Sequence, residues 1–384
     1  MIHVDRGADI GNESAVREVT QTAKASAWSL LALILLVEGL YAAYLCSTLQ
    51  PFPLEQSYLD MASRSATDIV SPFATVLATV QALAGHDLVA ARALSITLGL
   101  IAVVLAYVIG RNVAQDPVCG AGIALLFILF PPLTATYSLA TPHSLLATMI
   151  LAIIAIGMSA RTVEPAMGLR RITLVLMMAL LSLMAAAVHP VGAVMAMGGL
   201  LISGFFAAWS RQWFAPAIAS ALAAIGGAYL GLAGDAPFEP DVTTWGHDSI
   251  LTAAIMPYAM LWLGAAFGGL ALFSPSVRAR LGRHTAIGCM LGVSIAIGAV
   301  AMALIAGLWL PGQAVTGIGY VFPLAALAMT PAVVWVRWVM PAIRSFWAWV
   351  LLPVVMYSCF WVVLGPIAPD RFPYGARLES ADRP

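Results

Sequence analysis

Charged residues are scarce in this chain. Asp, Glu, Lys and Arg make up only 9% of its 384 residues, and 18 basic residues balance 18 acidic ones. So little charge, together with 61% hydrophobic residues and a mean hydropathy of +0.94, excludes an ordinary soluble domain. The zero net charge gives no electrostatic argument for nucleic acid, and we expect no nucleic-acid partner.

Cysteine is rare as well. The four cysteines stand singly, without the spacing of a metal site or a disulfide framework: Cys46, Cys119, Cys289 and Cys359. We interpret them as small apolar residues rather than redox groups. We therefore predict no metal site and no required cofactor. A divalent cation is the one possible cofactor, and it would bind only if the carboxylates of Glu55 and Asp60 converged with another acid such as Asp241 or Asp248.

Long apolar runs are what the chain has in abundance. Eleven of them fill most of the sequence: Trp28–Leu45, Leu88–Ile109, Gly120–Tyr137, Ser144–Ser159, Ile172–Val188, Val191–Trp209, Phe214–Ala233, Ile250–Phe273, Ala286–Trp309, Tyr320–Trp335 and Phe346–Leu364. Most approach the ~20 residues that a helix needs to cross a ~30 Å hydrocarbon layer. The pattern predicts an all-α polytopic membrane protein with about 11 transmembrane helices in one domain, residues 27–364. Residues 1–26 are predicted as a cytoplasmic tail, 47–87 as an outer loop and 365–384 as an outer tail.

Basic residues fall almost entirely on alternate sides of these runs. Thirteen lie on one side: Arg6, Arg17, Lys24, Arg111, Arg161, Arg170, Arg171, Arg211, Arg278, Arg280, Arg283, Arg337 and Arg344. Five lie on the other: Arg64, Arg92, Arg371, Arg377 and Arg383. Because cytoplasmic loops are enriched in Lys and Arg, the N-terminus is predicted in the cytoplasm and, with an odd number of spans, the C-terminus outside. The first run is too long for a cleaved signal peptide, so we expect it to stay as an anchor in a bacterial inner (cytoplasmic) membrane.

Acidic residues gather instead in two outer loops. Eight of the 18 acidic residues lie there: Glu55, Asp60, Asp68, Asp87, Asp235, Glu239, Asp241 and Asp248. Polar chemistry is therefore expected on the outer face. In the first of these loops, Ser71 and Pro72 fit a helix N-cap and first turn, and apolar residues follow at steps of three and four. This spacing predicts an interfacial amphipathic helix over residues 71–84, preceded by a short helix from Leu54 to Arg64.

Four stretches resemble the motifs of one membrane family in order and spacing. The first is the outer loop, where Ser71-Pro72 stands in the place of a His-Pro-Pro. The second is Ala91-Arg92-Ala93-Leu94-Ser95-Ile96-Thr97-Leu98-Gly99-Leu100. The third runs from Phe130-Pro131-Pro132 through Tyr137-Ser138 to Thr141-Pro142-His143-Ser144-Leu145-Leu146, and the fourth is Ala187-Val188-His189-Pro190. Over about residues 30–210 the chain is similar to the GT-C glycosyltransferases, in the branch of the protein O-mannosyltransferases and the lipid A aminoarabinose transferase.

The resemblance implies transfer of a sugar from a polyprenyl-phosphate donor to an acceptor on the outer face of the membrane. Such a reaction needs a carboxylate that takes the acceptor proton and cations that hold the departing phosphate. The resemblance points to Glu55 as the catalytic carboxylate, with Asp60 as the second. It assigns substrate binding to five residues: Arg64, Arg92, Tyr137, His143 and His189.

The chain also departs from the family pattern. Relatives often carry an Asp-Glu pair in the first outer loop, whereas this chain has a single Glu55 followed by Gln56. Thr141 replaces an arginine of the family's hairpin between the third and fourth spans, which corresponds to residues 130–146 here, and Gly319-Tyr320 stands where relatives have Arg-Tyr. A second hypothesis is therefore a catalytically silent accessory or scaffold subunit with membrane protein partners. A lipid or solute transporter is a third, disfavoured by the lack of an evident inverted repeat.

Each candidate residue also has a structural interpretation. Glu55 and Asp60 could lie on a solvated helix face. Arg92 could extend its side chain to the membrane interface, and His189 could cap a helix. Glu38 is a separate case because it lies midway along the first run, where a carboxyl costs several kcal/mol unless it is protonated, paired or facing a cavity. Its partner is open, with His189 as one candidate.

Overall fold

The computed structural model describes residues 27–44, 46–47, 53–64, 72–85, 88–114, 116–128, 137–159, 168–188, 190–206 and 211–233, with Leu327 and Val333 as single positions. All regular elements in these ranges are helices. They are Ala27–Tyr44, α2 (Pro53–Arg64), α3 (Pro72–Ala84), α4 (Leu88–Ala114), α5 (Pro117–Ile128), α7 (Pro142–Ser159), α8 (Gly168–Val188), α9 (Pro190–Phe206) and α10 (Arg211–Ala233). Both predicted tails and the last four predicted spans, apart from those two single positions, lie outside the described residues.

The helix boundaries follow local chemistry. Five helices, α2, α3, α5, α7 and α9, begin with a proline. The proline ring presets the helical φ, and its missing N–H would have no partner in the first turn. Asp116 caps α5, because its Oδ1 accepts a hydrogen bond from the backbone N–H of Val118 at 2.9 Å. After α3, Gly85 takes a φ of 104° and its N–H donates to the Gln81 carbonyl at 2.9 Å, which ends the helix.

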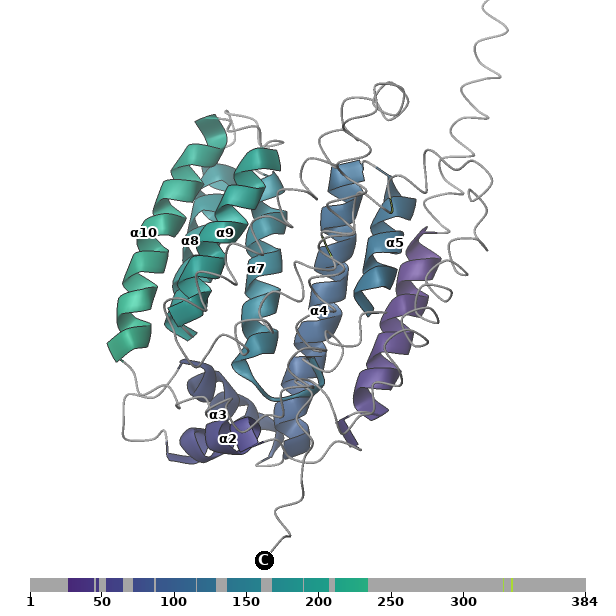
Figure 1. The fold of residues 1–384 in the computed structure, drawn as a ribbon, viewed down its shortest axis with the longest axis vertical. Coiled ribbons are helices and arrows are strands. Elements are labelled where there is room, and N and C mark those ends of the chain that lie inside the picture. The colour runs from purple at the N-terminus through teal and green to yellow at the C-terminus, as the bar shows by residue number, and fades with distance from the viewer. Residues whose placement is uncertain are drawn as a thin grey trace, which may run out of the picture.

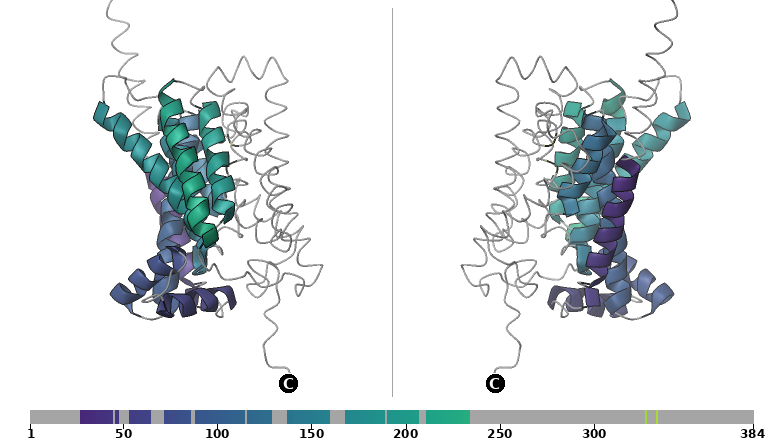
Figure 2. Two further views of the ribbon diagram at one scale, coloured as in Figure 1. Left: turned by 90° about the vertical axis from the view of Figure 1, so that its left-hand side faces the viewer. Right: turned by 90° about the vertical axis from the view of Figure 1, so that its right-hand side faces the viewer.

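The longer helices stand side by side, and two short helices lie across one end of them (Figure 1). Helix α4 packs on α5 and α7, while α8, α9 and α10 pack on one another and join α7. Both views in Figure 2 place α2 and α3 at the same end of the bundle, and α3 contacts α4 and α8 there. Their bounds lie within one residue of the two short helices predicted for the first outer loop. The predicted helices 54–64 and 71–84 are therefore confirmed.

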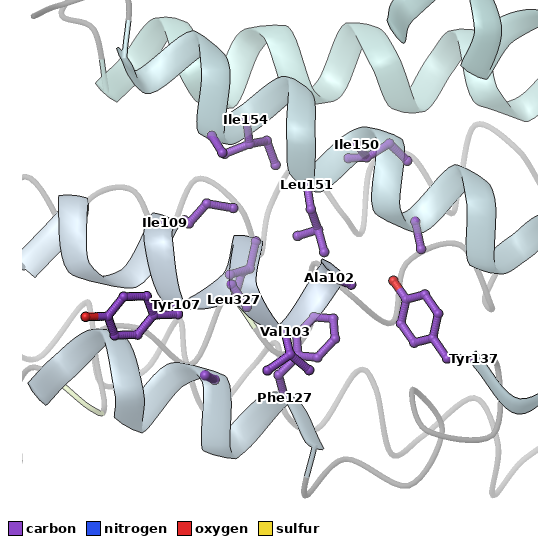
Figure 3. Packing of buried hydrophobic residues seen from close by; sticks show 14 of the residues in the cluster. Ala102, Val103, Tyr107, Ile109, Phe127, Tyr137, Ile150, Leu151, Ile154 and Leu327 are labelled. Atoms are coloured by element: carbon purple, nitrogen blue, oxygen red, sulfur yellow. The ribbon is translucent and has the colours of Figure 1, made fainter. Parts of the chain in front are cut away.

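The main hydrophobic core lies between α4, α5 and α7. Figure 3 shows Ala102 and Val103 of α4 close to Phe127 of α5, with Leu151 of α7 on the other side. Leu327, far along the sequence, belongs to the same buried cluster. A residue of the C-terminal part therefore takes part in the core of the N-terminal part.

Among the described residues, three helices are long and apolar enough to cross a membrane: Ala27–Tyr44, α4 and α8. They coincide with predicted runs, and α7, α9 and α10 also lie where apolar runs were predicted. The run predicted over Gly120–Tyr137 differs. Helix α5 begins earlier, at Pro117, and ends at Ile128, while Tyr137 belongs to the segment that leads into α7. Hydropathy misses this boundary because apolar residues continue beyond Ile128.

Candidate functional site

The centre of the candidate site is an ion pair between α2 and α4. Glu55, in the first turn of α2, has an exposed fraction of 0%, and Arg92, in the first turns of α4, has 1%. The Arg92 Nε donates to Glu55 Oε1 at 2.9 Å and its Nη2 donates to Oε2 at 2.7 Å. This is a bidentate arrangement, the strongest geometry available to an arginine and a carboxylate.

Two backbone groups also bind the pair. The backbone N–H of Ala140 donates to Glu55 Oε1 at 2.7 Å, and Arg92 Nη1 donates to the carbonyl of Cys46 at 2.9 Å. Cys46 follows the first helix, and Ala140 lies in the hairpin before α7. Two side chains thus join four segments of the chain: the end of the first helix, α2, α4 and the hairpin.

The burial of Glu55 and Arg92 limits the chemistry that the ion pair can perform. Both oxygens of Glu55 are engaged, and neither side chain has more than a trace of exposed surface. In this conformation the carboxylate is not presented to a substrate. Taking either partner away would leave a buried charge without its counter-charge, which is strongly destabilising. The geometry of the pair is therefore that of a structural contact that holds these four segments together.

The hairpin is fixed to α4 by a second layer of contacts. Ser95 Oγ of α4 lies 3.1 Å from Ser144 Oγ of α7, and Ser144 Oγ donates to the Thr141 carbonyl at 3.0 Å. One turn further along α4, a Cβ placed on Gly99 would lie 2.8 Å from the Cβ of Tyr137, so only glycine allows this approach. The arginine, serine and glycine of the Arg92–Gly99 motif each hold a neighbouring segment in place.

The structure does not bring the two predicted catalytic acids together. Asp60 is exposed, and five residues of helix separate it from Glu55, which turns it about 140° around the axis of α2. Arg64 is the last residue of α2, but its side chain lies outside the described part of the chain, as does the whole of His189. Within the described residues no group of three or more His, Cys, Asp or Glu converges on a common point.

Tyr137 and His143 lie in the hairpin region next to the ion pair, and both are buried. Helices α2 and α3, at the same end of the bundle, are held together by apolar contacts. Tyr58 of α2 meets Phe73 of α3 edge to face, with ring centroids 5.1 Å apart. These two predicted substrate-binding residues are therefore buried rather than placed on an open surface.

Sequence patterns did not predict the pairing of Glu55 with Arg92. The sequence does give both residues as charged groups of one outer region, but Glu55 was assigned to catalysis and Arg92 to substrate binding. Cys46 behaves as predicted for a small apolar residue: it is buried, and burial raises the pKa of its thiol, although the Arg92 charge acts in the opposite direction. Comparison with protein-family models, curated proteins and solved structures finds no significant match.

Proposed function

We propose that this chain is a polytopic membrane protein with a GT-C-like helical scaffold, and that it serves as a catalytically silent scaffold or accessory subunit. The observation that carries this proposal is the Glu55–Arg92 pair. A transferase needs a carboxylate that can accept a proton and cations that can hold a phosphate. Here the carboxylate and the cation nearest to the family motifs neutralise each other inside the protein.

The surface of the helices supports a location within a bilayer. Large apolar side chains point outward on several helices, such as Leu40 of the first helix, Leu176 of α8 and Leu222 of α10, which are 65%, 62% and 65% exposed. Small polar residues such as Ser95 and Ser203 are buried instead. Apolar residues outside and small or polar residues between helices are typical of membrane proteins. The short helices α2 and α3, lying across one end, fit an interfacial position.

The neighbours of Glu55 support the absence of catalysis. Successive residues of a helix lie about 100° apart, so an Asp-Glu pair would offer one carboxylate to Arg92 and a second in another direction. In this chain the adjacent residues are Leu54 and Gln56, which supply no second carboxylate. The remaining carboxylate, that of Glu55, is bound by Arg92.

A polyprenyl-phosphate-sugar transferase is the second candidate. It is favoured by the placement of α3 beside α4, because an interfacial helix at this position could wall a lipid-donor site. In an active enzyme a donor phosphate would take over the Arg92 guanidinium and release Glu55. Both candidate functions involve the same residues, so they are distinguished by whether Glu55 is required for sugar transfer.

The decisive experiment uses purified protein in vesicles that contain a polyprenyl-phosphate-linked sugar. The silent-subunit proposal expects no transfer by the unaltered protein and membrane protein partners that copurify after cross-linking in native membranes. The transferase hypothesis expects turnover that falls by about 10²–10⁴ in Glu55→Gln, while a Gln56→Ala control at an exposed position of α2 keeps its rate. Measurable transfer that depends on Glu55 would overturn our proposal.

A further inference from the structure

Three hydrogen-bond donors converge on the carboxylate of Glu55. The Arg92 Nε and the Ala140 backbone N–H both donate to Oε1, at 2.9 and 2.7 Å, and the Arg92 Nη2 donates to Oε2 at 2.7 Å. A planar guanidinium with an amide beside it matches a carboxylate in both shape and charge. The donors belong to α4 and the hairpin, whereas the carboxylate comes from α2. The contact therefore has two separate parts, a receptor and a ligand.

The receptor part is held in place by contacts that do not involve α2. The Arg92 Nη1 donates to the Cys46 carbonyl at 2.9 Å, which fixes the guanidinium from its other side. In the hairpin, the Ser144 Oγ donates to the Thr141 carbonyl at 3.0 Å and lies 3.1 Å from the Ser95 Oγ of α4. The hairpin is thus tied to the helix that carries the arginine. The donors should keep their positions when the carboxylate of α2 leaves them.

Helix α2, which supplies the ligand part, lies at the surface. Among the described helices it packs mainly on α3, where Tyr58 meets Phe73 edge to face. It lies across one end of the bundle (Figure 1). Its outward side is polar and exposed: Gln56, Ser57, Asp60 and Ser63. Helix α2 therefore separates the receptor from the surface, and a displacement of this one short helix would both remove the carboxylate and open the receptor.

We propose that Arg92 and the Ala140 N–H form a receptor for a small carboxylate anion, and that Glu55 is its built-in, exchangeable ligand. An incoming carboxylate makes the same three hydrogen bonds and supplies the counter-charge that the buried guanidinium requires. Because Glu55 is tethered to the receptor by the chain, it competes at an effective concentration of about millimolar or more. The site is therefore closed by its own glutamate until an external carboxylate is present above that level.

The donors favour a carboxylate over a phosphate. Three donors satisfy the two oxygens of a planar monoanion, whereas a tetrahedral phosphate carries further charged oxygens that would be buried without partners. The inference rests on the proposed function in one respect, that Glu55 is a bound ligand rather than a catalytic base. Its readouts are stability and thiol access. Sugar transfer that depends on Glu55 would overturn the accessory-subunit proposal without changing either readout.

Removal of the internal ligand tests the receptor directly. Glu55→Ala leaves the donors in place and vacates the space of a carboxylate. Thermal unfolding of the full-length variant would be followed in detergent at about pH 7, where carboxylates are ionised, with sodium formate replacing NaCl at constant ionic strength. Formate should raise the unfolding temperature in a saturable manner, and at ten times its Kd the ratio of folded to unfolded protein should rise about elevenfold. The unaltered protein and the exposed control Gln56→Ala should not respond.

Two comparisons make the result specific. The double variant Glu55→Met, Arg92→Met lacks the guanidinium and should show no effect of formate. Inorganic phosphate should stabilise Glu55→Ala less than formate does. A folded Glu55→Ala that unfolds at the same temperature in formate and in chloride would overturn the receptor, and so would an equal formate response in the double variant. A stronger response to phosphate than to formate would overturn the assignment of a carboxylate ligand.

A second measurement keeps the ion pair and decides the question if Glu55→Ala does not fold. Ala62 lies on the buried side of α2, with an exposed fraction of 6%. With the four native cysteines replaced by Ala, the thiol of Ala62→Cys should react with a maleimide at least about twofold faster when formate exceeds the millimolar effective concentration of Glu55 by roughly a hundredfold. The exposed thiol of Asp60→Cys should react at the same rate in formate and in NaCl. An Ala62→Cys rate that formate leaves unchanged would overturn the exchange.

Discussion

At the scale of single residues, the most consequential feature is a charge that is buried with its partner. Glu55 and Arg92 lie 37 residues apart in sequence, and neither local periodicity nor capping preferences predict their contact. The sequence does predict that α2 begins near Glu55 and that α4 begins near Arg92. It does not predict which groups fill the space between them. The resemblance therefore assigned Glu55 to catalysis and Arg92 to substrate binding, whereas the geometry shows that the two side chains bind each other.

Replacing Glu55 by Gln should destabilise the protein. The change leaves the Arg92 guanidinium buried beside a neutral amide, so we expect the free energy of unfolding in detergent micelles to fall by about 3–5 kcal/mol. Asp60→Asn, on the exposed side of α2, should stay within about 0.5 kcal/mol. The double variant Glu55→Met, Arg92→Met should recover most of the loss, since an apolar pair removes both buried charges. Equal losses in Glu55→Gln and Asp60→Asn would contradict this account.

The Cys46 thiol should react slowly, and its reaction should quicken only at raised pH. Burial raises its pKa above the usual value, so the thiolate forms at a higher pH than in an exposed cysteine. The matched control is Ser47→Cys with Cys46→Ala, because Ser47 is the exposed neighbour. With the other cysteines replaced by Ala, the alkylation rate of the control at neutral pH should be at least about tenfold higher. Similar rates and pH profiles would show that Cys46 is not shielded.

At the scale of helices, boundaries could be predicted where a local cap exists. Ser71 and Pro72 predict a helix that the structure places at Pro72–Ala84, and Gly85 ends it by taking a positive φ. The end of α5 at Ile128 was not predicted, because hydropathy has no feature that separates it from the residues that follow. Contacts between helices were also beyond prediction. Glycine positions that touch a neighbouring helix look the same in sequence as those that do not.

Gly226 and Gly227 in α10 illustrate this difference and provide a matched test. A Cβ on Gly226 would meet nothing within 4 Å, whereas a Cβ on Gly227 would collide with the Leu183 carbonyl of α8. Gly226→Ala should therefore be neutral or raise the free energy of unfolding by up to about 1 kcal/mol, because alanine favours the helix. Gly227→Ala should lower it by about 1–3 kcal/mol, because α8 and α10 must move apart. Thermal denaturation in detergent would compare the two, and a Gly227→Ala variant as stable as Gly226→Ala would refute this packing.

At the scale of the whole molecule, the structure supports the alternation on which the predicted orientation depends. Helix α7 starts at the hairpin bound to Glu55 and leads away from α2, so the chain returns toward that end through α8. Arg170, in the first turn of α8, therefore lies at the opposite end of the bundle from α2. The positions of the described arginines thus fit the asymmetry seen in the sequence. The predicted loop at Arg280 lies outside the described residues.

Accessibility of single cysteines would test the orientation. In a background with all four native cysteines replaced by Ala, Arg170→Cys and Asp60→Cys both put an exposed thiol on a helix at opposite ends of the bundle. Because positive residues are retained on the cytoplasmic side, a membrane-impermeant maleimide added from outside should label Asp60→Cys and spare Arg170→Cys until the membrane is permeabilised. Inverted vesicles should exchange the two results. Labelling of Arg170→Cys from outside intact cells would reverse the orientation and move the Glu55–Arg92 pair to the cytoplasmic side, where a donor exposed on the outer face would not reach it.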